Sequence, residues 1–405
     1  MDAPRSIRII MAGGGTGGHL YPGLAVAEQL HRRRADLNVV WAATPRLVDR
    51  RLLANFGRDY VPQRVVPPGR NPLGWLPFYR AWRHTCRFWD RYLRTESVDA
   101  VLALGGYAAA PAARAAGRRG IPVGLLNPDA LAGAANRYLM RWAQRIFTQW
   151  SFPTNAPEIW RQREATVGCP LRADLHALSR AEAARRLGLD ASRFTWLVTG
   201  ASLGAASIND ALLALLTDSE FSAALNGAGL AAEKWQILHL AGFQQGAAIR
   251  AIAARQEAVL WRVLDYCDDM PAAWAVADLA LSRAGAGTCA ELTACGVPAI
   301  LLPYPFHRDH HQQANAQRLC SAGAAWMVLD AANAAGNARQ LKPLLLKLLG
   351  DPKARRAMGA AAQKLARPDA AAAVADWLLA VAEERRSALR TGKVRADRRM
   401  LLAVR

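Results

Sequence analysis

The chain lacks the cysteine spacings that mark metal sites or disulfide frameworks. Its six cysteines form no CxxC pair and have no paired histidines at the spacing that would complete a metal site with them, and they stand apart from one another. Isolated thiols of this kind are typical of a reducing compartment, so we expect a cytoplasmic protein with reduced cysteines. The six are Cys86, Cys169, Cys267, Cys289, Cys295 and Cys320.

Long apolar runs are also missing. No segment reaches the roughly 18 uncharged apolar residues that are needed to span a bilayer. The first residues have no apolar stretch followed by a small-residue cleavage site. From the sequence we therefore expect neither a transmembrane helix nor a secretory signal peptide.

Lysine and acidic residues are scarce. Only six of the 52 basic residues are lysines, and the 32 acidic residues leave a net charge of +20. Such a charge favours an anionic partner, which can be nucleic acid, an acidic membrane surface or a phosphorylated substrate. The alternative is that the arginines are simply solvated. No nucleic-acid-binding module is recognisable, so we do not expect nucleic acid as a partner.

What the chain does contain is an alternation of buried-strand and helical patterns from end to end. Runs such as IRIIMA and VDAVLAL in the first half, and TWLV and VPAILLP in the second, are separated by helix-length segments. This alternation predicts βαβ units and parallel sheets. The second series starts afresh near Phe194, and 405 residues suffice for two cores. The prediction is an α/β protein of two doubly wound domains, joined near residues 170–180 and facing a cleft.

The first strand is followed by a cluster of glycines, GGGTGGH, that opens a helix. Gly13, Gly15 and Gly18 form a GxGxxG pattern. A dinucleotide site would also need an acidic residue at the end of the next strand, which here reads WAATPR. A P-loop would need Lys and Ser or Thr where His19 and Leu20 stand. What remains is that glycines expose backbone N–H groups at a helix N-terminus, which favours an anion.

Similar strand–glycine–helix turns recur three more times. One follows VDAVLAL, one follows TWLV and one follows ADLALS. Four such turns, two per domain, indicate phosphates bound by both domains, although each turn alone is equally compatible with a tight connection that needs a positive φ. The residues of the three turns are Gly105, Gly106 and Tyr107; Gly200, Ser202 and Gly204; and Gly285, Ala286, Gly287 and Thr288.

The order of several motifs resembles the MurG family of glycosyltransferases. The segments that carry the resemblance are AGGGTGGHLYPGLAVAEQL, GGYAAAP, VGCPLR, TGASLGAASIN, DDMPAAWAVADLALSRAGAGTCAEL and DHHQQANA, between about residue 7 and about residue 385. The resemblance implies a GT-B fold of two Rossmann-like domains. It places an acceptor and membrane-side domain over 1–172, a donor domain over 173–368, a helix that returns to the first domain over about 369–386, and a basic tail over 387–405.

The activity that the resemblance implies is a step of peptidoglycan synthesis at the cytoplasmic face of the bacterial inner membrane. N-acetylglucosamine would pass, with inversion, from UDP-N-acetylglucosamine to the 4-hydroxyl of undecaprenyl-pyrophosphoryl-N-acetylmuramoyl-pentapeptide. The alternatives are another GT-B lipid glycosyltransferase that uses a UDP-sugar, and a non-catalytic UDP-sugar-binding paralogue. No cofactor is expected. Because the chain has no DxD motif to hold a metal, we expect metal-independent catalysis.

The resemblance also implies a donor site. Glu291 corresponds to an acid that hydrogen-bonds the ribose hydroxyls, the backbone around Cys267 to a uracil contact, and Arg172 to a cation beside the diphosphate. The alternatives are an exposed helix glutamate for Glu291 and a polar helix face for the sugar contacts. The diphosphate cradle and the sugar contacts are implied at Ser202, Gly285, Ala286, Gly287, Thr288, His311, Gln312 and Asn315.

The acceptor-side loop departs from the family. Where many members read HEQN before a glycine, this chain has Asn127 for the Glu, Pro128 for the Gln and Asp129 for the Asn. Ala284 also replaces a common Ser, so a related acceptor or an altered activity is open. The acceptor and diphosphate contacts are expected at Gly14, Gly15, Thr16, Gly17, Gly18, Gly105, Gly106, Tyr107, Asn127 and Asp129.

His19 stands just beyond the first glycines and is the expected general base. The acceptor hydroxyl must lose a proton as its oxygen bonds to the anomeric carbon. A helix N-terminus disfavours the imidazolium form, so we expect a neutral His19 that is competent as a base. Asp129 is an alternative base or a group that orients His19, and a purely structural histidine is a further alternative.

The segment PFYRAWRHTCRFWDRYLR, residues 77–94, predicts an amphipathic helix. We expect its apolar stripe to pack on the sheet, and its arginines, with Trp75 and Leu76 on a preceding loop, to meet anionic lipid. The alternative is a plain crossover helix with a solvated face. The apolar stripe is Phe78, Trp82, Cys86, Trp89 and Leu93, and the basic stripe is Arg80, Arg83, Arg87, Arg91 and Arg94.

Overall fold

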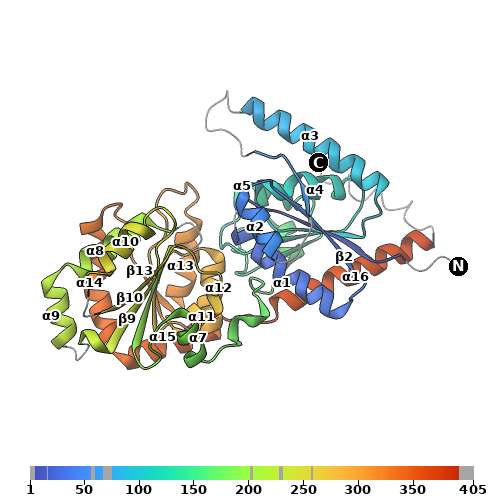
Figure 1. Ribbon diagram of the computed structural model, residues 1–405. Coiled ribbons are helices and arrows are strands. Elements are labelled where there is room, and N and C mark those ends of the chain that lie inside the picture. The colour runs from blue at the N-terminus through green and yellow to red at the C-terminus, as the bar shows by residue number, and fades with distance from the viewer. Residues whose placement is uncertain are drawn as a thin grey trace. The chain divides into compact units, whose positions relative to one another are not determined.

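The computed structural model describes residues 5–15, 17–55, 60–66, 75–200, 204–227, 231–256 and 259–391. The chain divides into two compact units. The first unit is Met1–Arg172 with Pro368–Arg405, and the second unit is Ala173–Arg367. Each unit is built on a parallel sheet with helices packed against it (Figure 1).

In the first unit the strands are parallel and lie in the order β3-β2-β1-β4-β5-β6-β7. The register places Ile9 of β1 beside Val39 of β2 on one side and Ala100 of β4 on the other. The strands are mostly small and β-branched apolar residues because both faces of a parallel sheet are covered. They are β1 (Arg8–Ala12), β2 (Asn38–Ala43), β3 (Tyr60–Pro62), β4 (Ala100–Ala103), β5 (Val123–Asn127), β6 (Arg145–Thr148) and β7 (Glu164–Thr166).

Helices cover both faces of this sheet. Ile9 belongs to an apolar cluster with α1, α2 and α16, whereas Ile10 belongs to a cluster with α3, α4 and α5. Successive residues of a strand point to opposite faces, so the two clusters are the two cores of the unit. The helices are α1 (Gly17–Arg33), α2 (Leu47–Asn55), α3 (Trp75–Thr95), α4 (Gly106–Gly117), α5 (Ala134–Leu139), α6 (Glu158–Arg163) and α16 (Ala370–Arg390).

Helix α16 comes from the C-terminal part of the chain and completes a core of the first unit. Val374 is fully buried there, and Arg386 pairs with the buried Asp99 at 3.1 Å, just before β4. The helix ends at Arg390 instead of at about residue 386 as expected, because no Gly or Pro interrupts residues 386–390. Residues 392–405 of the expected basic tail lie outside the described residues.

In the second unit the parallel strands lie in the order β10-β9-β8-β11-β12-β13. They are β8 (Phe194–Thr199), β9 (Trp235–Leu240), β10 (Leu260–Leu264), β11 (Leu279–Ser282), β12 (Ala299–Leu301) and β13 (Ala325–Met327). The helices are α7 (Arg180–Leu187), α8 (Ala206–Leu216), α9 (Ser219–Gly227), α10 (Gly246–Ala253), α11 (Met270–Val276), α12 (Ala286–Cys295), α13 (His311–Ser321), α14 (Ala334–Gly350) and α15 (Pro352–Lys364).

Both sheets have a point where the strand order reverses. In the first unit β1 lies between β2 and β4, and in the second unit β8 lies between β9 and β11. Doubly wound proteins bind ligands at this point, at the carboxyl ends of the strands. The four glycine-rich turns follow β1 and β4 in the first unit and β8 and β11 in the second. The topology therefore gathers the turns in pairs at the position where a ligand is expected.

The expected amphipathic helix is α3. Cys86, Trp89 and Leu93 are buried against the sheet, and the five arginines of the basic stripe are exposed. Trp75 and Leu76 are the first two residues of the helix and not part of a loop, because Pro77 suits a first helical turn, where its missing N–H is not needed. Their exposed fractions are 56% and 55%. In the described part of the chain, no helix is long and apolar enough to cross a bilayer.

Candidate active site

The turn between β1 and α1 is closed by a carboxylate of the protein itself. Gly14 and Gly15 have φ values of 136° and 90°, which favour glycine. The buried Asp49 of α2 accepts hydrogen bonds from the Gly15 N–H at 2.8 and 2.9 Å. It also accepts from the N–H of Thr44 at 3.1 Å. The Gly15 N–H is therefore already hydrogen-bonded to a carboxylate of the protein. We did not expect this contact from the sequence. Thr16, an expected contact, lies outside the described residues.

His19 lies in the first turn of α1, against the β4–α4 turn. A Cβ atom on Gly106 would lie 2.9 Å from His19 Nε2, and one on Gly105 would lie 3.3 Å from Nδ1. Both glycines also have positive φ values, 99° for Gly105 and 73° for Gly106. These two glycines therefore make room for the imidazole, in addition to forming the turn.

The electrostatic surroundings of His19 keep its ring neutral. Burial lowers the pKa of His19, and this effect exceeds the influence of Asp129, the Leu104 carbonyl and Asp49, which act to raise it. The neutral imidazole is the form that accepts a proton near pH 7. From the sequence we expected the helix N-terminus to disfavour the charged form of His19, whereas burial is the largest cause of its lowered pKa. Asp129 is close enough to act on the ring through its charge.

Asn136 of α5 connects the β4–α4 turn to the end of β5. Its Oδ1 accepts from the Gly106 N–H at 3.2 Å, and its Nδ2 donates to Asn127 Oδ1 at 2.9 Å. Asn127 in turn donates to the Asp129 carbonyl at 3.1 Å. Asn127, which replaces the usual Glu of the family, is therefore held by amide hydrogen bonds. This role of Asn136 was not predicted, because only its place downstream of the loop is visible in the sequence.

Tyr107 points its hydroxyl toward the first glycine turn. A Cβ atom on Gly15 would lie 3.5 Å from the Tyr107 oxygen. This oxygen is buried and has no hydrogen-bond partner within the described residues. Burial raises the pKa of Tyr107, so the group stays protonated. An unpaired buried hydroxyl costs about 1–3 kcal/mol, so this donor is suited to a ligand group at the turn.

The second unit presents an open helix N-terminus after β11. Gly285 caps α12 without a side-chain hydrogen bond, and the first turn contains no acidic residue. Among the described residues, a Cβ atom on Gly287 would meet nothing within 4 Å, and one on Gly285 only the Thr288 hydroxyl at 3.9 Å. The amides and partial positive charge of such a terminus are suited to a phosphate group.

Glu291 lies on α12 beyond this N-terminus and is held by an indole. The Nε1 atom of Trp274, on α11, donates to Glu291 Oε2 at 2.9 Å. A carboxylate has about four acceptor sites, so its chemistry suits vicinal hydroxyls as well as an indole N–H. The sequence suggested Glu291 by resemblance, but it gave no sign that Trp274 would hold it.

Two buried side chains fix the β11–α12 turn. Arg283 pairs with Asp330 at 2.8 Å, with side-chain exposures of 8% and 1%, and also donates to the Ser207 hydroxyl at 2.8 Å. The fully buried Asn315 donates to the Ala284 carbonyl at 3.0 Å. Asn315, an expected sugar contact, therefore supports the backbone of the turn. The Arg283–Asp330 pair was not anticipated.

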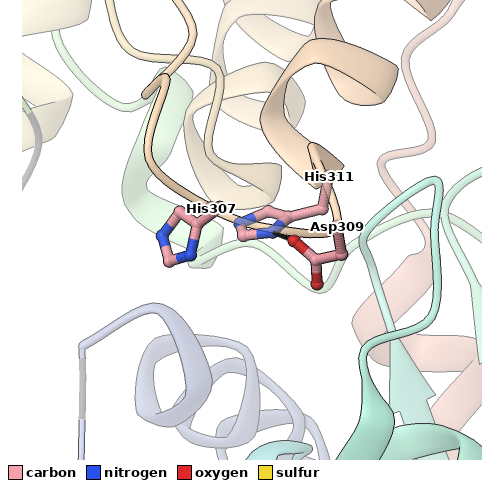
Figure 2. A group of neighbouring side chains, drawn as sticks. All are labelled: His307, Asp309 and His311. Atoms are coloured by element: carbon pink, nitrogen blue, oxygen red, sulfur yellow. Dashed lines mark hydrogen bonds and ion pairs between the residues drawn. The ribbon is translucent and has the colours of Figure 1, made fainter. Parts of the chain in front are cut away.

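His311 and Gln312 start α13, as expected, and are only half-buried. Gln312 Oε1 accepts from the Tyr304 N–H at 3.0 Å, and His311 Nδ1 lies 2.8 Å from Asp309 Oδ1. Burial is the largest single influence on the pKa of Asp309 and acts to raise it, but the hydrogen bonds from His311 and the charges of His311 and His307 together outweigh it, so the pKa is lowered. His307 completes a cluster with Asp309 and His311 (Figure 2).

The remaining expected contacts are spread over both units. Arg172 is the last residue of the first unit, with its guanidinium 5.7 Å from the centre of the Tyr21 ring. Cys267 is buried in the connection between β10 and α11. Ser202, in the β8–α8 turn, lies outside the described residues, whereas Gly204 of that turn has φ 75°. The cleft expected between the domains stays a prediction.

The two doubly wound units with paired glycine turns have the architecture of the GT-B class. Two family models match the chain: the glycosyltransferase family 28 N-terminal domain over residues 9–148 and the glycosyltransferase family 28 C-terminal domain over residues 195–374. The chain belongs to glycosyltransferase family 28. The fold class expected from the sequence is confirmed.

Curated relatives and solved structures agree with this assignment. The chain is 34% identical over 376 residues to the UDP-N-acetylglucosamine–N-acetylmuramyl-(pentapeptide) pyrophosphoryl-undecaprenol N-acetylglucosamine transferase of Desulfitobacterium hafniense (strain Y51), covering 90% of this chain and 96% of the relative. It is 37% identical over 378 residues to the transferase of the same description from Halorhodospira halophila (strain DSM 244 / SL1), covering 91% and 97%.

Among solved structures, MurG from Acinetobacter baumannii has a TM-score of 0.66 and 28% identity, covering 92% of this chain and 99% of that chain. The UDP-GlcNAc 2-epimerase from Neisseria meningitidis, with a TM-score of 0.62, 14% identity and coverage of 92% and 100%, shares the fold. The resemblance to the MurG family is therefore confirmed.

Proposed function

We propose that this chain transfers N-acetylglucosamine, with inversion, from UDP-N-acetylglucosamine to the 4-hydroxyl of an undecaprenyl-pyrophosphoryl-linked N-acetylmuramoyl-pentapeptide. The observation that carries the proposal is the glycine-capped N-terminus of α12, whose first turn holds no acidic residue, with the indole-held Glu291 on the same helix. An anion site and a fixed carboxylate, one and a half turns apart, match a diphosphate and the ribose hydroxyls next to it. The family and the two curated relatives support the choice of donor and acceptor.

In this proposal the second unit binds the donor. The N–H groups at Gly285–Gly287 and the Thr288 hydroxyl receive the diphosphate, and Glu291 receives the ribose. His311 and Gln312 contact the sugar, while Asn315 supports the turn from behind. As the glycosidic bond to UDP breaks, negative charge grows on the leaving diphosphate, and the helix N-terminus and Arg172 compensate for it.

The first unit activates the acceptor. The neutral His19 accepts the proton of the 4-hydroxyl as that oxygen bonds to the anomeric carbon. Tyr107 offers its unpaired hydroxyl to the acceptor, and the acceptor diphosphate uses the amides that Asp49 leaves available. No metal is required for these steps. A chelator should therefore leave transfer intact, and activity that vanishes with chelator and returns with Mg²⁺ or Mn²⁺ would contradict this point.

The decisive experiment is a transfer assay with purified protein. UDP-N-acetylglucosamine and undecaprenyl-linked muramoyl-pentapeptide should give a disaccharide product, detected by mass spectrometry, with a farnesyl-linked acceptor and a peptide-free acceptor alongside. No product from any acceptor, with UDP binding retained, would favour a non-catalytic UDP-sugar-binding role. Product only from another lipid-linked acceptor would favour a different lipid glycosyltransferase.

One observation favours a related acceptor as the second candidate. Asn127 and Asn136 form an amide pair where the family usually places a carboxylate. An amide can both donate and accept hydrogen bonds, whereas a carboxylate only accepts them. The chemical group of the substrate that is recognised here can therefore differ. The variant Asn127→Glu separates the two cases. It should increase transfer to the muramoyl-pentapeptide acceptor if the amide recognises a group of a different acceptor, because Glu is the usual residue of the family, and it should leave this transfer unchanged or decrease it if the muramoyl-pentapeptide acceptor is the natural one.

The proposal places the protein peripherally at the cytoplasmic face of the inner membrane. The exposed Trp75 and Leu76 at the start of α3 lie on the same helix as the exposed arginines Arg80, Arg83 and Arg87. Attraction to anionic lipid stabilises membrane binding by about 1 kcal/mol for each cation near the surface. Reversing the three arginines to Glu should abolish salt-sensitive sedimentation with anionic vesicles, whereas unchanged sedimentation would place the membrane surface elsewhere.

A further inference from the structure

We propose that His307, Asp309 and His311 form a binding site for a transition-metal dication such as Zn²⁺ or Co²⁺. The three residues alternate along the segment that leads into α13, and each offers one ligand atom, all within 4.8 Å of one another. Figure 2 shows the two imidazoles side by side, with the carboxylate of Asp309 against His311. The second unit thus carries a preassembled set of two nitrogen ligands and one oxygen ligand.

The backbone of this segment explains why alternate side chains meet. His310 has a left-handed conformation with φ 48°, and its N–H donates to the His307 carbonyl at 3.2 Å. This turn folds the segment back on itself, so that the ring centres of His307 and His311 lie 4.5 Å apart. His311 Nδ1 and Asp309 Oδ1 are already 2.8 Å apart.

The donor set selects the class of ion. Imidazoles suit Zn²⁺, Co²⁺ and Ni²⁺, whereas Mg²⁺ and Ca²⁺ prefer oxygen ligands. Ligand atoms about 2.0–2.2 Å from a tetrahedral ion lie roughly 3.4 Å from one another. The cluster must therefore contract from a spread of at most 4.8 Å. His307 and Asp309 are exposed on the turn before α13, so a contraction of this size is confined to two surface side chains.

Binding of the ion would change the donor site. His311 is the sugar contact of the proposed function, and an ion on its imidazole would withdraw it from the sugar. Transfer should then be inhibited by Zn²⁺, although it does not require a metal. This consequence rests on the proposed function, whereas binding of the ion itself does not.

The first test measures binding without any substrate. Full-length protein without a polyhistidine tag is freed of metal with a chelator and titrated with Co²⁺, whose visible absorption reports imidazole and carboxylate ligation. We expect one Co²⁺ per chain, with affinity lowered about tenfold or more in His307→Ala and in Asp309→Asn. His84→Ala, which removes an exposed histidine of α3, is the matched control and should bind as the parent does. Absence of the absorption, or equal affinity in all variants, would overturn the site.

The second test measures transfer with Zn²⁺ present. The parent should be inhibited, and His307→Ala should keep its basal transfer while its sensitivity to Zn²⁺ falls about tenfold or more. Equal sensitivity of parent and variant would show that the ion acts elsewhere and would also overturn the site. Because the Co²⁺ absorption needs no substrate, failure of the site is distinguishable from failure of the proposed function.

Discussion

The turns that open α1 and α12 look alike in sequence but differ in what they contain. Both follow a buried strand, both are rich in glycine and both lie where the strand order of a sheet reverses. In the first turn, Asp49 occupies the Gly15 N–H and lies against Gly14. In the second, no described atom would lie within 4 Å of a Cβ atom on Gly287, and no acid stands in the first helical turn.

The difference teaches that a glycine-rich turn does not by itself define an anion site. The same backbone amides serve either a carboxylate of the protein or a phosphate of a ligand. In this chain the first turn is stabilised from within and, in the proposed function, positions the base, whereas the second is proposed to receive the nucleotide. Variants that remove the base, remove the nearby carboxylate, or add or remove a carboxylate at either turn test this difference.

The largest effect is expected from removing the base that only the first turn carries. His19→Ala should lower kcat by about 10²–10⁴, the usual contribution of a general base, while UDP affinity stays unchanged. Since burial lowers the pKa of His19, parent activity should fall with decreasing pH only below about 6.5, where the imidazole becomes protonated. Steady-state kinetics over a pH series measure both effects.

Asp129→Asn is the matched control for the base, because it restores the usual residue of the family. It should keep most of the activity if His19 accepts the proton. A crippled Asp129→Asn variant beside a mildly affected His19→Ala variant would show that Asp129 is the base and that our assignment is wrong.

The next effect concerns the carboxylate that accompanies the open turn. Glu291→Ala should weaken UDP and UDP-N-acetylglucosamine binding together. Each hydrogen bond to a charged group is worth roughly 1.5–3 kcal/mol, so the loss in affinity should be about tenfold or more. Isothermal calorimetry measures it. Glu384→Ala, which removes an exposed helix glutamate of α16, should bind UDP as the parent does. Equal UDP affinity in Glu291→Ala would remove Glu291 from the ribose site.

A third variant introduces a carboxylate at the start of α12, as Asp49 supplies one to the turn before α1. Gly287→Asp places a carboxylate at the N-terminus of α12, where a Cβ atom meets no described atom within 4 Å. Charge repulsion and competition for the amides should lower UDP affinity about tenfold, which corresponds to about 1.4 kcal/mol. Gly287→Asn has nearly the same shape without the charge and should have a smaller effect. If both variants bind UDP equally weakly, the cause is steric and not the anion.

The smallest effect should follow from removing the Asp49 carboxylate from the turn before α1. Asp49→Asn removes the carboxylate that accepts hydrogen bonds from the Gly15 and Thr44 N–H groups. The free energy of unfolding, measured with urea, should therefore fall by about 1–3 kcal/mol. Asp49 acts to raise the pKa of His19, so its removal should move the acid limb of the activity profile to lower pH. Asp36→Asn, at an exposed carboxylate, should change neither. An acid limb that moves upward would contradict the electrostatic part.

Much of the fold follows from local sequence patterns. The strands β1, β2, β4, β8, β11 and β12 were predicted because each lies in a run of buried apolar residues bounded by helix-length segments. The three-residue strands β3 and β13 were not predicted, whereas β12 has the same length but lies within the longer apolar run VPAILLP. Trp75 and Leu76 were placed on a loop because Pro77 suggested a break, although proline is well tolerated in a first helical turn.

The candidate site was predictable only in part. Glycine turns and His19 are visible in one stretch of chain, and Glu291 was suggested by resemblance. Asp49 stands 34 residues from Gly15 and reaches it only because β2 pairs with β1 and α2 follows β2. Trp274 is likewise brought to Glu291 by the packing of α11 beside α12. Contacts of this kind depend on topology, which no local pattern encodes.

The return of α16 to the first unit has a consequence for biosynthesis. The ribosome delivers residues 1–172 first, yet Val374, Leu378 and Ala382 belong to the same apolar core as Ile9 and Leu30. That core stays incomplete until the entire second unit has been made and α16 has left the exit tunnel. Packing of the first sheet is therefore completed only after the second unit has been synthesised.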